Sequence, residues 1–275
     1  MRDRKAIDRM RVVYQLPHME QVHVHKDIPY KIVHGETLRM DVYYPLDMPA
    51  HTSRPAVLLV HGGSQAEHVK QIKESSSYVS WGQLLAASGL IAVMFQHRTD
   101  EGFTQLPEAN SDVDDLIRYV RDHGASFQID AERLCLWVFS QGALHGLCTV
   151  LRETPAYIRC LVCYYGLMSI MNPSYFPWAT EEKELVTAFS PVYHLLLENA
   201  SKVAPMFIAK AGKDHAFLNE SPDEFCYVVS LLNIPPLTFM NHPTGKHCFD
   251  IVNDDARTRE IIQATLVFLV SHLEQ

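Results

Sequence analysis

The stretch RLCLWVFSQGA, residues 133–143, decides the fold of this chain. Its first seven residues form a mostly apolar run of strand length, and residues 144–153 beyond it have helical character. Ser140 stands between the two and therefore lies in a sharp turn from a strand into a helix. Because Gly142 and Ala143 are small, the helix and the strand can approach closely, and we expect the Ser140 hydroxyl to lie exposed at the strand end.

Similar apolar runs recur along the chain and alternate with helical patterns. The six predicted parallel strands are AVLLV at 56–60, IAVMF at 91–95, RLCLWVF at 133–139, RCLVCYY at 159–165, PMFIAKA at 205–211 and PLTFM at 236–240. The clearest predicted helices are 110–123, with Ser111 or Asp112 as N-cap and Gly124 at its end, and 256–273. This alternation is typical of one doubly wound α/β sheet with helices on both faces.

Two segments depart from the alternation. Residues 21–35 and 36–47 look like extended segments joined near Gly35, which predicts an antiparallel pair at the N-terminal edge of the sheet. Residues 167–185 mix aromatic side chains, prolines and charges without a period, and we interpret them as a small lid insertion. Since no repeat or long linker divides the sequence, we predict a single domain over residues 1–275.

Composition excludes several classes of protein. With 47% hydrophobic residues the 275-residue chain can bury one large core or two small ones. The 24 Lys and Arg against 32 Asp and Glu leave a mildly acidic chain without a basic block, so we expect no nucleic-acid partner. No apolar run approaches the roughly 18 residues that span a bilayer. Residues 1–14 also lack the apolar run of a secretory signal, so the expected location is the cytoplasm.

The cysteine pattern favours reduced thiols. Most of the six cysteines stand in apolar strand-like or helix-like surroundings, which is typical of thiols in a core. Cys160 and Cys163 form the sequence's single C-x-x-C, and no second pair accompanies them. Because the segment around them resembles a buried strand, we do not expect it to bind a metal or act in redox chemistry.

Backbone amides that could hold an oxyanion are predicted at two places. The amide of Gln141 lies at a helix N-terminus, where the helix dipole favours negative charge. The strand at 56–60 is followed by His61-Gly62-Gly63, whose glycines let the backbone approach a substrate oxygen. Gly63 is the first choice for the second donor and Ser64 the next, with His61 holding the loop by hydrogen bonds.

A carboxylate follows a later strand of the predicted sheet. The strand at 205–211 is followed by Gly212, Lys213 and Asp214, which places Asp214 at the carboxyl edge, where open α/β folds bind ligands. Asp214 could instead cap a helix starting near Ala216. Asp223 and Asp250 are weaker candidates for the acid.

The chain has 15 histidines, and histidine is the residue expected to act as the base for Ser140. The last predicted strand is followed by NHPTGKHCFD, residues 241–250, which offers His242 and His247. We prefer His247, because the extra loop residues, Gly245 among them, let it fold back over the strand ends towards Ser140. Ser140, Asp214 and His247 then follow one another in the order of an α/β-hydrolase triad.

Several motifs together resemble the α/β-hydrolases, close to their carboxylesterase, dienelactone-hydrolase-like and prolyl-oligopeptidase-like branches. The motifs are LRMDVYYP at 38–45, VHGG at 60–63, FSQG at 139–142, AGKDH at 211–215 and GKH at 245–247. The resemblance implies a triad of Ser140, Asp214 and His247, an acyl-enzyme intermediate, and neither metal nor organic cofactor. Since dienelactone hydrolases typically use a Cys nucleophile, Ser140 argues against that specific activity.

The elbow departs from the family pattern at one position. The family sequence is usually G-x-S-x-G, but Val138 stands at the first small position of this one. A Val there is expected to crowd the strand against the helix, so either the fold relaxes slightly or the elbow lies elsewhere.

The predicted activity is hydrolysis of carboxylic esters with short or small acyl groups, since the lid is too brief to enclose a long chain. Tyr175, Phe176 and Trp178 either line a substrate pocket or only pack the lid. A peptidase or amidase and an acyltransferase would use the same triad. A non-catalytic binding protein would be favoured if Val138 distorted the elbow and buried Ser140. The expected partner is a small-molecule ester, and the sequence does not predict an oligomeric state.

Overall fold

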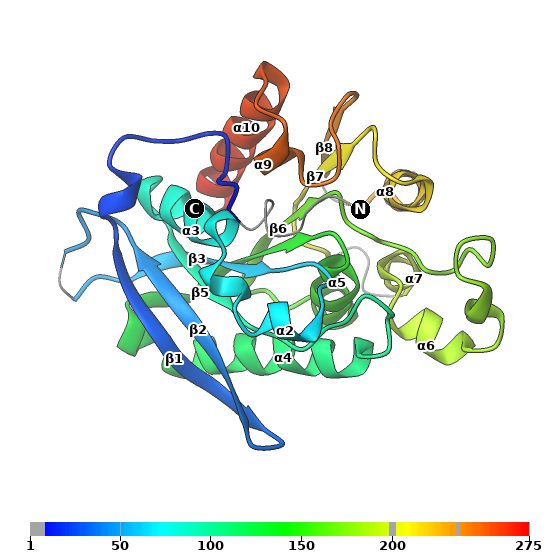
Figure 1. Cartoon of the computed structure of the whole chain (residues 1–275), viewed down its shortest axis with the longest axis horizontal. Helices are drawn as coiled ribbons and strands as arrows, with labels where there is room; N and C mark the ends of the chain where they lie inside the picture. The colour runs from blue at the N-terminus through cyan, green and yellow to red at the C-terminus, as the bar shows by residue number, and fades with distance from the viewer. Residues whose placement is uncertain (1–8, 50, 198–201, 235–236, 275) are drawn as a thin grey trace.

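A single eight-stranded sheet runs through the protein in the order β1-β2-β4-β3-β5-β6-β7-β8 (Figure 1). The structure is a computed structural model, and it describes residues 9–49, 51–197, 202–234 and 237–274. The strands are β1 (His23–Val33), β2 (Glu36–Tyr44), β3 (Arg54–Val60), β4 (Ile91–Phe95), β5 (Ile129–Phe139), β6 (Ile158–Tyr164), β7 (Met206–Ala211) and β8 (Leu237–His242).

Strand directions confirm the predicted fold class. Strands β3 to β8 are mutually parallel, whereas β1 pairs antiparallel with β2, and β2 pairs antiparallel with β4. The hairpin between β1 and β2 turns at His34 and Gly35, which have φ values of 50° and 81°. Two successive residues with positive φ are typical of the tight turn that joins antiparallel strands. The last predicted strand began at Pro236, which lies outside the described residues.

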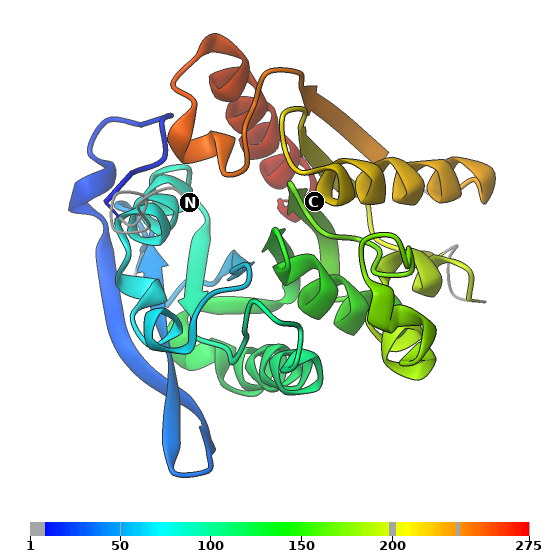
Figure 2. The ribbon, with the colours of Figure 1, turned by 45° about the vertical axis from the view of Figure 1, so that its right-hand side comes forward.

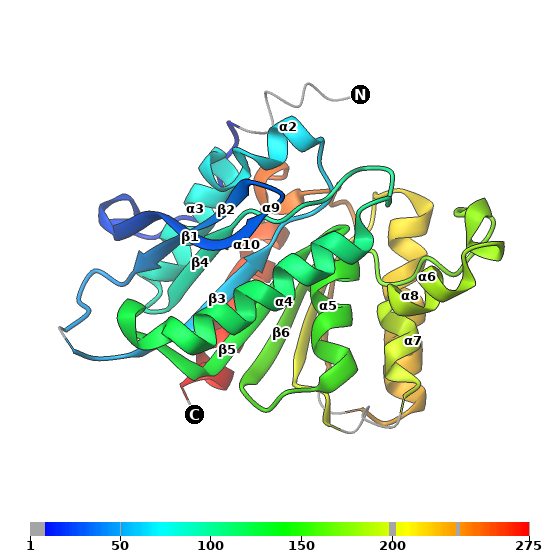
Figure 3. The same cartoon turned by 90° about the horizontal axis from the view of Figure 1, so that it is seen from below.

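Helices cover both faces of this sheet (Figures 2 and 3). The helices in the described residues are α2 (Ala66–Val69), α3 (Ser76–Ala87), α4 (Leu106–His123), α5 (Gly142–Glu153), α6 (Lys183–Ala188), α7 (Pro191–Leu195), α8 (Ala216–Leu231), α9 (Phe249–Val252) and α10 (Ala256–Leu273). Short 3-10 turns are η1 (Met19–Gln21), η2 (Ile72–Glu74), η3 (Gly124–Phe127) and η4 (Pro177–Thr180). Helices α4 and α5 pack on one face, and α3 and α10 pack on the other.

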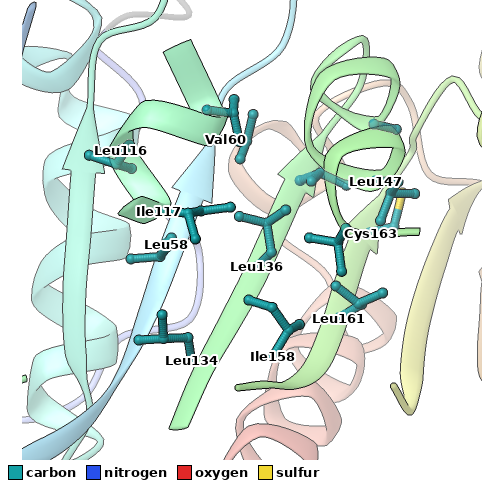
Figure 4. Packing of buried hydrophobic residues seen from close by; sticks show 14 of the residues in the cluster. Leu58, Val60, Leu116, Ile117, Leu134, Leu136, Leu147, Ile158, Leu161 and Cys163 are labelled. Carbon is teal, nitrogen blue, oxygen red and sulfur yellow. The ribbon is translucent and has the colours of Figure 1, made fainter. Parts of the chain in front are cut away.

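The core is divided by the sheet into two layers. Leu134 and Leu136 of β5 point into the layer beneath α4 and α5 (Figure 4), and Val138 belongs to the same layer. Trp137 and Phe139 point into the layer beneath α3 and α10. Helices cover both faces of the sheet, so the residues that point to either face are apolar. The sequence of the strand is therefore a continuous apolar run. Burial on both faces therefore explains why β5 lacks the alternation of a half-exposed strand.

Helix α4 begins earlier than predicted. It starts at Leu106 rather than Asn110, with Pro107 in its first turn, where a missing N–H costs no hydrogen bond. The predicted caps at Ser111 and Asp112 are therefore wrong. Asp112 is buried inside the helix, where its Oδ1 accepts a hydrogen bond from Arg98 Nη2 at 2.7 Å.

The ends of both predicted helices agree with the structure. Helix α4 ends at His123 with Gly124 as its C-cap residue, although Gly124 has a right-handed φ of −51° and the chain continues into η3. The residue that takes the left-handed conformation is Gln128, with φ 55°. The closing helix agrees with its predicted bounds, because α10 covers Ala256–Leu273 and buries Ile261, Ile262 and Leu269 against the sheet.

The six cysteines are free thiols, as predicted. Cys160 and Cys163 belong to core layers on opposite faces of β6. Since successive strand residues alternate between faces, the two sulfurs of this C-x-x-C point away from each other and do not share a ligand. In the described ranges no helix is long and apolar enough to cross a membrane.

The segment predicted as a lid, 167–185, contains η4 and the first turn of α6. Met168 joins the core layer beneath α4 and α5, whereas most other apolar side chains of the segment belong to a third, smaller cluster. Phe176, Ala179 and Val186 pack there with Leu106 and with Leu218 of α8. The segment is thus anchored by its aromatic side chains, and its role as a lid stays a prediction.

Candidate active site

Ser140 occupies the predicted turn between β5 and α5. Its φ is 52°, a left-handed conformation that is uncommon for a residue with a side chain. Backbone hydrogen bonds hold the turn, because Ser140 N donates to Tyr164 O at 3.1 Å and Leu167 N donates to Ser140 O at 3.0 Å. Such a conformation costs on the order of 1–3 kcal/mol and persists only when neighbouring structure imposes it. The Ser140 side chain remains partly exposed at the carboxyl edge of the sheet.

The turn accommodates Val138 because the residue of α5 that faces it is a glycine, which has no side chain. Gly146 of α5 lies directly over Val138, and a Cβ added to Gly146 would stand 2.6 Å from Val138 Cγ1. Val60 of β3 and Leu136 of β5 bound the same gap, at 3.2 and 3.0 Å. The small residue that the family usually places on the strand is thus replaced by one on the facing helix. Val138 neither buries Ser140 nor displaces the elbow.

We expect Gly146→Ala to destabilise the fold by about 1–3 kcal/mol, because the new methyl overpacks against Val138. In the double variant Gly146→Ala/Val138→Ala, the added methyl fills space that the valine methyls leave. The two substitutions should therefore couple favourably by about 1–3 kcal/mol in a double-mutant cycle. Urea unfolding of the four proteins measures this coupling, and strictly additive free energies would contradict the packing argument.

Asp214 and His247 come together from the loops after β7 and β8. His247 Nδ1 donates to Asp214 Oδ2 at 2.5 Å, and the side chain of Asp214 is 2% exposed. The other carboxylate oxygen, Oδ1, accepts from the amide of His215 at 2.8 Å. Helix α8 begins at Ala216 without a side-chain cap, so Asp214 is not its N-cap. The bond at Nδ1 leaves Nε2 as the nitrogen that can take a proton.

Ser140 and His247 line one cavity of about 260 Å³ at this edge of the sheet. Within the described ranges no hydrogen bond joins Ser140 Oγ to His247. Catalytic hydrogen bonds are often long without substrate and tighten in the complex. The structure thus places Ser140 and His247 on a single opening, with the side chain of Asp214 buried and bonded to His247.

The predicted oxyanion loop reaches the same cavity. Gly62, Gly63 and Ser64 line it, and a Cβ added to Gly62 would lie 2.9 Å from Ser140 Cβ. The backbone amides of Gly63 and Gln141 donate to no residue that the structure describes, so both remain available to a ligand. The side-chain amide of Gln141 already has a partner, since its Nε2 donates to Asp100 O at 2.9 Å.

Three buried histidines pack behind the predicted oxyanion loop, residues 61–64. His61 Nδ1 donates to Gly62 O at 2.8 Å, and the ring of His97 stacks on that of His61 with centroids 3.6 Å apart. His97 Nε2 donates to His61 O at 3.2 Å, and His145 packs edge-on against His97. Burial lowers the pKa of each of the three imidazoles, so they are neutral at pH 7. His61 thus has the structural contacts expected from its position.

The alternative acids and bases have other partners. His242 is buried, and its Nε2 lies 3.1 Å from Asp255 Oδ1 at the start of α10. Asp223 is paired with Lys210 at 2.5 Å. Neither His242 nor Asp223 lines the cavity of Ser140. No group of three or more His, Cys, Asp or Glu in the described part of the chain could hold a metal ion.

The aromatic residues predicted to bind substrate lie outside this cavity. Tyr175, Phe176 and Trp178 belong to the separate apolar cluster beside α8, and their role in substrate binding stays a prediction. The aromatic and acidic residues that do line the cavity are Tyr78, Trp81, Phe139, Tyr165 and Asp250. Two of these residues could have been found from the sequence. Tyr165 is the last residue of the apolar run 159–165, at the carboxyl edge of the sheet, and Asp250 stands three residues after His247.

The sequence model of the BD-FAE family matches residues 40–155, a range that includes Ser140 and the predicted oxyanion loop. No curated protein matches the chain in sequence.

Solved structures match nearly the whole chain. A propionate-bound thermophilic esterase, Est2, of the Planctomycetes species Thermogutta terrifontis has a TM-score of 0.73 at 19% identity, with 93% of this chain and 96% of that one covered. A truncated carbohydrate esterase from gut microbiota has a TM-score of 0.73 at 17% identity, covering 92% and 97%. These matches confirm the resemblance noted in the motifs: the chain has the fold of the α/β-hydrolase superfamily.

Proposed function

We propose that the protein is a serine hydrolase of carboxylic esters with small acyl groups. One observation carries the proposal: Ser140, in a left-handed turn, opens into the same cavity as His247, whose Nδ1 is held by the buried Asp214. A nucleophile, a base within its cavity and a carboxylate that orients the base are the three parts of nucleophilic acyl transfer.

Acylation follows from this geometry. His247 Nε2 takes the hydroxyl proton as Ser140 Oγ attacks the ester carbonyl, and Asp214 stabilises the imidazolium that forms. The carbonyl oxygen becomes an oxyanion, which the unpaired amides of Gly63 and Gln141 can hold. Losing one such donor costs roughly 3–4 kcal/mol in the barrier. His247 then returns its proton to the departing alcohol.

Deacylation repeats the same steps with water. A water molecule beside His247 Nε2 loses a proton to the imidazole and attacks the acyl carbon on Ser140. The same two amides hold the second oxyanion, after which the acid leaves and Ser140 regains its proton from His247. An alcohol in place of water would make the protein an acyltransferase, and an amide substrate would make it an amidase.

The size of the cavity supports small acyl groups. A volume of about 260 Å³ lies below the roughly 300–1,000 Å³ of pockets that enclose drug-sized ligands. The esterase from Thermogutta terrifontis has been solved with propionate and with butyrate bound. A binding protein without catalysis is disfavoured, because its premise was a Ser140 buried by Val138.

The proposal is tested with p-nitrophenyl esters of graded chain length. We expect kcat/KM to be highest among the acetate, propionate and butyrate esters and to fall by at least about tenfold at the decanoate, which corresponds to about 1.4 kcal/mol of lost fit. Anilides of the same acids and added primary alcohols test the amidase and acyltransferase alternatives in parallel. Absence of turnover with every ester would refute the esterase assignment.

A location in a reducing compartment such as the cytoplasm is part of the proposal. Its support is the set of six free cysteines, of which four are buried in the core. Buried thiols without disulfide partners are typical of proteins that stay in a reducing environment.

A further inference from the structure

Three residues around the Ser140 cavity have left-handed backbones. They are Ser140 at φ 52°, Tyr165 at φ 40° and Cys248 at φ 60°. For Ser140 the nucleophile turn explains the conformation. For an aromatic residue such as Tyr165 a positive φ is a clear outlier, and such outliers concentrate at functional sites. Contacts in the tertiary structure must therefore impose this conformation on Tyr165, and the three triad residues do not explain why it is needed.

Tyr165 connects His247 to the interior of the protein. Its ring meets the His247 ring edge to face, with centroids 4.7 Å apart and planes at 62°. Its hydroxyl donates to Asp250 Oδ1 at 2.8 Å, and its backbone N donates to Ala209 O at 2.7 Å. The side chain is thus fixed at the backbone and at its far end, with its ring against the imidazole.

Asp250 is fixed in turn from two sides. Its second oxygen, Oδ2, accepts from Trp81 Nε1 at 2.8 Å, and its backbone oxygen accepts from Val13 N at 2.9 Å. The side chains of Trp81, Tyr165 and Asp250 are all nearly fully buried. Burial raises the pKa of the Asp250 carboxyl, an effect that the hydrogen bonds from Trp81 and Tyr165 oppose. A buried carboxyl with a donor on each oxygen has little freedom to rotate.

The Asp214 bond is the one hydrogen bond that holds the His247 ring in the described residues. A single hydrogen bond tolerates a range of angles, so the imidazole can still tilt by small rotations about its Cα–Cβ and Cβ–Cγ bonds. The His247 side chain is 33% exposed, so solvent lies on part of its surface and does not restrain it. The ring of Tyr165 supplies the second contact, because it packs edge to face against the imidazole.

We propose that Tyr165, held by Asp250 and Trp81, is a positioning residue that sets the ring plane of His247 so that Nε2 faces Ser140. This inference rests on the proposed triad. It assigns Asp250 a role different from that of a triad acid: its carboxylate holds the phenol that orients the base.

Graded substitutions at Tyr165 test the proposal. Tyr165→Leu removes the ring, and we expect kcat to fall by about 100-fold with KM changed by less than about twofold, since small misplacements of a reacting group carry costs of this size. Tyr165→Phe keeps the ring but removes the anchor on Asp250, and kcat should fall by about tenfold. Asp250→Asn should resemble Tyr165→Phe, because an amide offers one acceptor oxygen to two donors.

The neighbouring Tyr164 provides a matched control. It is the buried last residue of β6, directly before Tyr165, and its hydroxyl is bonded to Thr265 Oγ1 at 2.7 Å, outside the cavity. Tyr164→Phe removes an equally buried phenol oxygen, so it should lower the melting temperature without changing kcat. A kcat loss in Tyr164→Phe equal to that in Tyr165→Phe would show a general effect of packing and overturn the proposal.

A spectroscopic measurement separates this proposal from the proposed function. The Nδ1 proton shared by His247 and Asp214 should give a far-downfield proton resonance that is absent from Asp214→Asn. We expect this resonance to broaden or vanish in Tyr165→Phe and Tyr165→Leu and to persist in Tyr164→Phe. Because no substrate is needed, the result holds even if no ester is hydrolysed. An unchanged resonance in folded Tyr165→Leu, or a rise in KM that accounts for the whole loss of kcat/KM, would overturn the positioning role.

Discussion

Ser140→Ala is expected to lower kcat/KM for p-nitrophenyl butyrate by at least about 10⁴-fold, because the acyl-enzyme cannot form without the hydroxyl. The amides of Gly63 and Gln141 and the cavity remain, so the residual rate should still exceed the rate in buffer alone. Binding of butyrate as a product inhibitor of the wild type should be retained by the variant, since the cavity itself is unchanged. Steady-state kinetics and a calorimetric titration with butyrate measure the two quantities.

Two controls make this result specific. Ser126→Ala removes an exposed hydroxyl in η3, which precedes β5 and so lies at the opposite end of that strand from Ser140, and it should leave kcat/KM unchanged. Thermal unfolding of Ser140→Ala should remain within a few degrees of the wild type, because alanine and serine are similarly strained at a positive φ. Turnover within about tenfold of the wild type in Ser140→Ala would show that the nucleophile lies elsewhere.

His247→Gln is expected to lower kcat by about 10⁴-fold, because glutamine cannot accept and return the Ser140 proton. Glutamine is chosen since its side-chain N–H can still donate to Asp214 Oδ2. Alanine at this position would leave the buried Asp214 carboxylate, which is 2% exposed, without a hydrogen-bond donor from residue 247. The variant could then lose activity because it unfolds rather than because it lacks the base. Burst kinetics with p-nitrophenyl acetate measure the acylation step directly.

His242→Gln is the matched control for this prediction. His242 is buried with its Nε2 near Asp255 and Thr258, so the substitution should reduce stability by about 1 kcal/mol or more and leave kcat within about threefold. The reverse pattern, with activity lost in His242→Gln and kept in His247→Gln, would transfer the role of base to His242.

The sequence by itself determined the sheet, its hairpin edge, the closing helix and the loops that carry Ser140, Asp214 and His247. Each of these depends on local signals: an apolar run of strand length, a glycine turn, or a helical period over 256–273. Parallel strands bring their carboxyl ends to one edge, so the order of strands and loops along the chain already predicts which loops meet. The triad candidates could therefore be chosen before any packing was known.

The tertiary structure decided what local patterns do not encode. Whether Val138 fits depended on Gly146, which faces it only after α5 has packed on the sheet. Phe176 and its aromatic neighbours were free to face either side of their segment, and packing against α8 took them to a separate cluster. The contacts that hold Tyr165 join Asp250 to residues 85 and 169 positions away. No period in the sequence spans such distances, because side chains on different elements become neighbours only when the whole core closes.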